Sequence, residues 1–148
     1  MFTVLDDFRD KYGITESQLG LIVGVGFITG FLSQILFSPQ ADKGHAKKLV
    51  MTGIIFEILG TLFMAFGHAF LPLIIGRLLA GFGVGISEPA LRRILILSDP
   101  ERMGRNLGLI VSAGVAGFTA GPILSALTAD TLGLSAPFLI VAACLLPV

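Results

Sequence analysis

The residues with the clearest potential for chemistry are an arginine and a glutamate in one apolar stretch, Leu71–Ala90. Arg77 and Glu88 are eleven residues apart. In an α-helix they would share a face to within about 20°, with a rise of about 16 Å that prevents direct pairing. Gly81 lies within about 40° of Arg77 on that face. Because a guanidinium keeps its charge and is costly in lipid, we expect Arg77 to face a water-filled cavity. There it would line the cavity, lower the pKa of a neighbouring carboxylate or hold an anionic group.

Both charged residues also have a simpler interpretation. Arg77 is about two turns from the end of its helix, so it could extend outward to the membrane surface. Glu88 precedes Pro89 and lies four residues before Arg92, a spacing that allows a local ion pair. We favour the cavity for Arg77 and the local pair, or a loop contact, for Glu88.

Glycines recur in this stretch and in an earlier apolar run. Such glycines let two membrane helices approach closely, so both segments should form tightly packed helices, the later one as the wall of a polar pathway. The positions are Gly20, Gly24, Gly26, Gly30, Gly81, Gly83 and Gly85.

A second small-residue stripe lies further along the chain, where Ala113, Gly117, Gly121 and Ser125 recur every four residues. Pro122 removes a backbone donor and should bend the helix. A smooth, bendable stripe suits a helix that rocks against a neighbour. Static close packing explains the same spacing equally well.

Two other polar residues interrupt the apolar runs. We interpret Glu57 as structural rather than as a proton carrier, since no partner is evident in the sequence, and Gln34 as a helix-to-helix hydrogen bond rather than a substrate ligand. No metal-ligand spacing, Ser/His/Asp arrangement or phosphate-binding loop occurs. We therefore expect no metal, no cofactor and no enzymatic activity.

The composition identifies the class of protein. The chain is 54% hydrophobic and 14% charged, against about 25% charged in soluble domains. The segments 17–41 and 106–129 contain no Asp, Glu, Lys or Arg, and about 20 such residues can cross a membrane. The zero net charge suggests no nucleic-acid partner. We predict an all-α membrane protein with about five transmembrane helices, at 18–38, 49–67, 71–96, 106–127 and 134–148.

The basic residues orient these helices. The loop at 42–48 contains three lysines and the segment after residue 91 contains four arginines, so both should face the cytoplasm. Within the first loop, Asp42 could lock the loop through Lys43 and Lys47. Alternatively, the loop is simply a solvated basic segment that sets topology. By alternation residue 1 lies outside, and its acidic start is not a signal peptide. A preceding helix is therefore expected, and the short last span suggests a longer protein.

At these residues the chain resembles the drug/proton antiporter branch of the major facilitator superfamily. The fourth helix of that family carries Leu-xxx-Arg-xx-Gln-Gly-x-Gly-Ala-Ala. Leu73, Arg77, Gly81 and Gly83 match this motif, and Ala80 replaces the glutamine.

Two further family motifs are present in part. The fifth-helix motif Gly-xxx-Gly-Pro-xx-Gly-Gly is matched by Gly117, Gly121 and Pro122, whereas Ser125-Ala126 replaces the final glycines. The loop motif Gly-xxx-Asp-Arg-x-Gly-Arg-Lys aligns with Asp42, Lys43 and Lys47. In that loop Ser38 replaces the first glycine and Gly44 or His45 replaces the second.

The resemblance implies a partial N-terminal six-helix bundle, 1–148, with family helices two to six at 17–148. It implies proton-coupled export of a small molecule by alternating access, with a first helix and a C-terminal half as partners. Arg77 would occupy a proton-relay position, 117–122 would form the interface between halves, and Asp42 would lock the cytoplasmic gate. The alternative is a non-transporting membrane assembly protein or an inactive transporter remnant.

Overall fold

The computed structural model describes residues 11–146, and all regular structure within them is helical. This confirms the predicted all-α class. The acidic start at 1–10 and the last two positions of the predicted final span lie outside the described residues. The elements are α2 (Glu16–Gln40), the π-helical turn η2 (Ala41–His45), α3 (Ala46–Phe66), α4 (Phe70–Ser98), the 3-10 turn η3 (Pro100–Arg102), α5 (Met103–Leu132) and α6 (Ala136–Leu145).

Local sequence signals set the ends of α2. Thr15 caps the start of α2. Its Oγ1 accepts a hydrogen bond of 3.3 Å from the backbone N–H of Gln18, and Gln18 Oε1 accepts one of 3.0 Å from the backbone N–H of Thr15. The helix ends at Gln40, directly after Pro39. The chain reverses within η2, where Gly44 has a φ of 88°. Only glycine adopts this conformation readily, so a side chain at position 44 would strain this turn.

Three helical stretches are long and apolar enough to cross a membrane: 16–66, 70–98 and 100–132. The first contains both α2 and α3, which are 25 and 21 residues long. The helices α4 and α5 are longer than predicted, at 29 and 30 residues. The helix α6 has only 10 residues, half of what a crossing requires (about 20).

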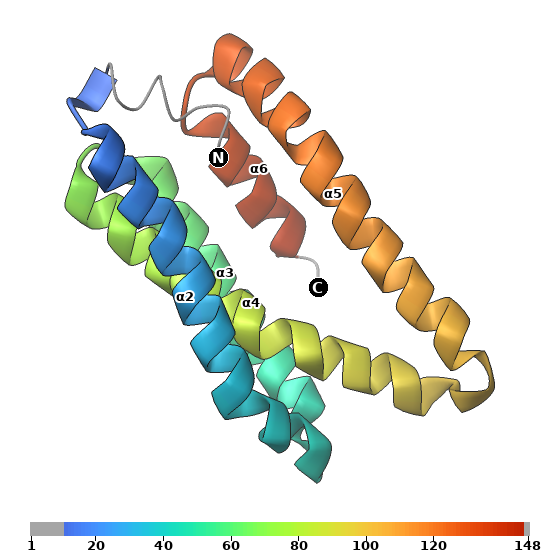
Figure 1. Ribbon diagram of the computed structural model, residues 1–148. Coiled ribbons are helices and arrows are strands. Elements are labelled where there is room, and N and C mark those ends of the chain that lie inside the picture. Colours follow the sequence, from blue (N-terminus) through green and yellow to red (C-terminus); the bar gives the residue numbers. More distant parts are fainter. Residues whose placement is uncertain (1–10, 147–148) are drawn as a thin grey trace.

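The helices α2, α3 and α4 form one bundle, in which α4 packs against both of the others (Figure 1). The last turns of α4 extend beyond this bundle, and α5 returns at a distance from it (Figure 1). The shorter α6 lies between α5 and the bundle and packs against α3. Its start is fastened to the end of α3 by the Ser135 hydroxyl, which donates to the Ala65 carbonyl at 2.6 Å.

Apolar side chains form a core at each end of the bundle, and glycines form the contact between. One core contains Leu19, Met64 and Leu73, and the other contains Leu49 and Ile86. Between these cores, helix backbones approach closely at glycines.

The glycines of α4 face two neighbours. A Cβ atom on Gly83 would lie 2.5 Å from the Gly53 carbonyl oxygen on α3, and one on Gly81 would collide with the Gly26 carbonyl on α2. Real Cβ atoms essentially never come within 3.0 Å of such atoms. The helix α4 is therefore the closely packed wall that its glycine spacing predicts.

Candidate transport site

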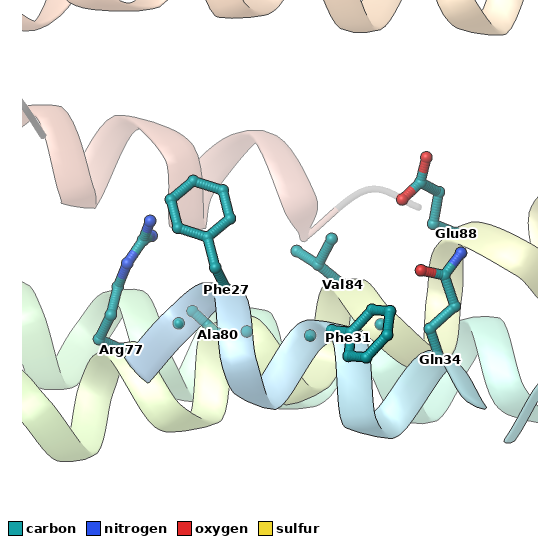
Figure 2. Close-up of a pocket in the computed structure, with 11 residues that line it drawn as sticks. Phe27, Phe31, Gln34, Arg77, Ala80, Val84 and Glu88 are labelled. Atoms are coloured by element: carbon teal, nitrogen blue, oxygen red, sulfur yellow. The ribbon is translucent and has the colours of Figure 1, made fainter. Parts of the chain in front are cut away.

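A groove of about 380 Å³ runs between α2 and α4 (Figure 2). Its floor consists of the small residues at which the two helices meet, and larger side chains rise along its sides. The lining residues are Gly26, Phe27, Gly30, Phe31, Gln34, Arg77, Ala80, Gly81, Val84, Gly85 and Glu88. The size is typical of small-molecule sites, which span about 300–1,000 Å³. Two of the three residues expected to act in transport, Arg77 and Glu88, therefore project into one groove, and Gly81 forms part of its floor.

Arg77 is among the lining residues and lies at one end of the groove. Its guanidinium carbon is 5.9 Å from the centre of the Phe27 ring, within the range of a cation–π interaction. Its stem fills the space left by Gly26, where an added Cβ would lie 2.6 Å from Nε. Within residues 11–146 this buried Nε has no hydrogen-bond partner. The charge is thus held in place without being neutralised by this part of the chain.

Glu88 lies toward the opposite end of the groove, near Gln34 in Figure 2. It forms an ion pair with Arg92, four residues later, and both side chains are 42% exposed. This confirms the predicted local pair. The negative charge of Glu88 is therefore compensated by Arg92. Within the described chain, the positive charge of Arg77 is the charge in the groove lining that has no ion-pair partner.

The structure corrects the interpretation of Gln34. Within the described residues its amide makes no hydrogen bond to another helix, and it lines the groove instead. The expected helix-to-helix bond at this position is therefore wrong for this part of the chain.

Glu57 has a partner that the sequence did not reveal. Ser87 on α4 donates a hydrogen bond of 2.7 Å to Glu57 Oε1. The two residues are 30 positions apart, so only the packing of α3 on α4 brings them together. Gly53 on α3 and Gly83 on α4 face each other and allow the two helices to approach. The presence of glycines in both segments is the sequence signal that could have suggested this contact.

Asp42 pairs with a residue on another helix rather than with its loop neighbours. Its Oδ1 lies 3.3 Å from Arg93 Nε, an ion pair without hydrogen-bond geometry. No ion pair joins it to Lys43 or Lys47 within residues 11–146. The pair connects the loop between α2 and α3 to the end of α4, so the two basic segments lie at the same end of the bundle. This agrees with their predicted location on one membrane face.

The motif on α5 lies away from the bundle. An added Cβ on Gly117 or Gly121 would meet nothing within 4 Å among the described residues. Further along the same helix Ser125 is buried. The structure therefore presents 117–122 as an open small-residue surface on α5.

Comparisons with known proteins agree on one family. The sequence profile of the Major Facilitator Superfamily matches residues 1–148. The chain is 28% identical, over 88% of its length, to an uncharacterized MFS-type transporter of Methanocaldococcus jannaschii. It is also 28% identical, over 86% of its length, to the quinolone resistance protein NorA of Staphylococcus aureus. The match covers 34% and 33% of these relatives, so the chain spans about one third of their length. No solved structure matches the chain.

Proposed function

Because the chain belongs to the major facilitator superfamily, we propose that it forms part of a transporter that exports a small organic molecule in exchange for protons. It is an integral membrane protein with helices long enough to cross the bilayer. Transport in this family requires no bond to be made or broken. The alternative, a non-transporting assembly protein or an inactive remnant, is not favoured, because the relatives are named as a transporter and a resistance protein.

The observation that carries this proposal is the uncompensated charge of Arg77 in a groove at membrane depth. A cation buried only for stability would be expected to pair with a carboxylate, since an unpaired buried charge costs several kcal/mol. Within the described chain Arg77 instead has an aromatic neighbour and a cavity. This arrangement suits a residue that interacts with a moving ion or substrate, with Gly81 keeping the groove floor open and Glu88 at its other end.

The remaining family motifs have supporting roles in the proposal. Asp42 would act as a latch for the cytoplasmic gate, since its pair with Arg93 joins the loop between α2 and α3 to α4. In this proposal the pair breaks and reforms as the helix ends move. Lys43 and Lys47 would hold the loop at the cytoplasmic surface. The open surface at 117–122 would contact the second half of the transporter during alternating access. We place the present helices as family helices two to six, with the first helix and the C-terminal half as partners.

Proteoliposome transport by the intact protein tests this proposal. A fluorescent quinolone is a reasonable first probe, given the name of one relative. We expect an imposed proton gradient to drive quinolone movement, and Arg77→Ala to reduce the flux at least tenfold. The exposed Arg105→Ala is the matched control, since it removes a cation outside the groove. Full gradient-driven flux with Arg77→Ala would remove Arg77 from the mechanism, and the absence of flux with all tested classes of small molecule would contradict transport itself.

A further inference from the structure

We infer that the groove between α2 and α4 binds an organic anion, with a carboxylate at Arg77 and an aromatic body between Phe27 and Phe31. The inference rests on the proposed transport function for its biological meaning. Its physical basis is the charge, the aromatic side chains and the unused polar groups of the groove itself.

The charge balance of the groove favours an anion. Arg77 and Glu88 are the charged residues in the lining. Glu88 is offset by Arg92, whereas Arg77 has no ion pair with any residue in 11–146. The groove therefore has an excess of one positive charge. A carboxylate matches the planar donor arrangement of a guanidinium and can form two parallel hydrogen bonds with it.

The guanidinium is already positioned for such a ligand. Gly26 leaves the space in which the arginine stem lies, and Phe27 lies against the guanidinium. Figure 2 shows the side chain rising from α4 beside Phe27, at one end of the groove. Because Nε is buried, the terminal nitrogens are the donors available to a ligand. A held side chain loses less entropy on binding than a mobile one.

The shape of the groove favours a flat aromatic body. Its floor is formed by Gly30, Ala80 and Gly85, so no side chain blocks a ring that lies along it. Phe27 and Phe31 project beside it and remain 59% and 64% exposed. Aromatic faces of this kind stack with ligand rings. Further along, the free amide of Gln34 can donate to or accept from a second polar group on a longer molecule.

Equilibrium binding of three naphthalene probes of similar shape tests the inference. The intact protein in phosphatidylcholine nanodiscs is titrated with radiolabelled 2-naphthoate, neutral 2-naphthamide and cationic 2-naphthylmethylamine, after subtraction of binding to empty nanodiscs. We expect the anion to bind at least tenfold more tightly than the amide, and the cation to bind most weakly. Equal affinity for the three probes, or a preference for the cation, would overturn the inference.

Variants assign the preference to the groove. Arg77→Gln should abolish the tenfold preference for naphthoate, and Phe27→Leu should weaken naphthoate and naphthamide alike. Arg77→Lys retains the charge without the planar donor pair, so it should keep a reduced anion preference. This second variant decides the matter if the glutamine variant does not fold. A preference that survives Arg77→Gln, or that is lost equally when Arg105→Gln removes an exposed cation outside the groove, would overturn the assignment.

The intact protein also tests a competing occupant. If an acidic side chain from outside residues 11–146 pairs with Arg77, naphthoate will show no preference in the intact protein, and the inference is overturned. These measurements use no proton gradient. Selective binding without export would therefore contradict the proposed function alone, and export without anion preference would contradict this inference alone.

Discussion

The helices α4 and α5 have similar glycine contents but very different surroundings. Added Cβ atoms on Gly81, Gly83 and Gly85 of α4 would collide with α2 or α3. The same atoms on Gly117 and Gly121 of α5 would meet nothing within 4 Å among the described residues. Glycine spacing thus identifies a helix that can pack closely, but it does not identify the partner. In α4 the glycines are already used for packing, whereas in α5 they remain available.

The largest expected difference between these helices concerns stability. Gly83→Ala would place a Cβ 2.5 Å from the Gly53 carbonyl and 2.8 Å from the Glu57 amide, both rigid backbone atoms. We expect a loss of about 1–3 kcal/mol in unfolding free energy from this overpacking. Unfolding in mixed micelles measures it.

The matched control on α5 is Gly114→Ala, whose Cβ would meet nothing within 4 Å in residues 11–146. Alanine is favoured over glycine in a helix by up to about 1 kcal/mol, so this variant should be neutral or slightly stabilising. Equal destabilisation by the two substitutions would show that α5 is as closely packed as α4 in solution.

A second prediction extends the comparison to two positions on α2. Gly26→Ala would place a Cβ 2.6 Å from Arg77 Nε, whereas a Cβ at Gly20 would meet nothing within 4 Å in the part of the chain that the structure describes. Because the obstructed group is a flexible side chain, Arg77 should move from its position in the groove without unfolding the protein. We expect gradient-driven flux in proteoliposomes to fall at least fivefold for Gly26→Ala and to stay unchanged for Gly20→Ala. A similar flux in both variants would show that the position of Arg77 does not matter.

A third prediction concerns the contact between α3 and α4. Ser87→Ala removes the hydroxyl that donates a hydrogen bond of 2.7 Å to Glu57. The half-buried carboxyl of Glu57 then lacks this partner. This should cost about 1–2 kcal/mol in unfolding free energy. In a double-mutant cycle, Ser87→Ala should have a smaller effect when Glu57 is already leucine. Additive effects would exclude a significant interaction between the two side chains.

The smallest stability effect is expected at the end of α4. The side chains of Arg93 and Asp42 are 37% and 67% exposed, and exposed ion pairs contribute about 0–1 kcal/mol. Asp42→Asn should therefore change the unfolding free energy little. If the pair acts as a gate latch, Asp42→Asn should nevertheless alter the gradient-driven flux in proteoliposomes. An unchanged flux together with unchanged stability would make the pair a passive surface contact.

Much of the fold follows from the sequence because lipid imposes simple constraints. The uncharged segments 17–41 and 106–129 predict two of the long helices. The four-residue spacing of Glu88 and Arg92 predicts their ion pair, since helix geometry alone determines it.

Contacts between helices could not be predicted in the same way. The pairs Asp42–Arg93 and Glu57–Ser87 depend on how each helix is rotated and how far it is shifted along its neighbour. Neither quantity is encoded in local spacing. The groove that contains Arg77 was expected, but Phe27 and Gln34 as its companions follow only from the packing of α2 on α4.

The most direct test of the central claim is the accessibility of position 77 to water. Arg77→Cys in a Cys144→Ser background provides one thiol in this chain, since Cys144 is its only cysteine. Ile55→Cys is the control, because Ile55 is 54% exposed and lies in the middle of the apolar helix α3. A membrane-impermeant sulfonated thiol reagent should label position 77 and not position 55. A proton gradient should change the labelling rate at position 77. If position 77 reacts only with a lipid-soluble maleimide, as position 55 should, Arg77 faces lipid and the transport role assigned to its groove is contradicted.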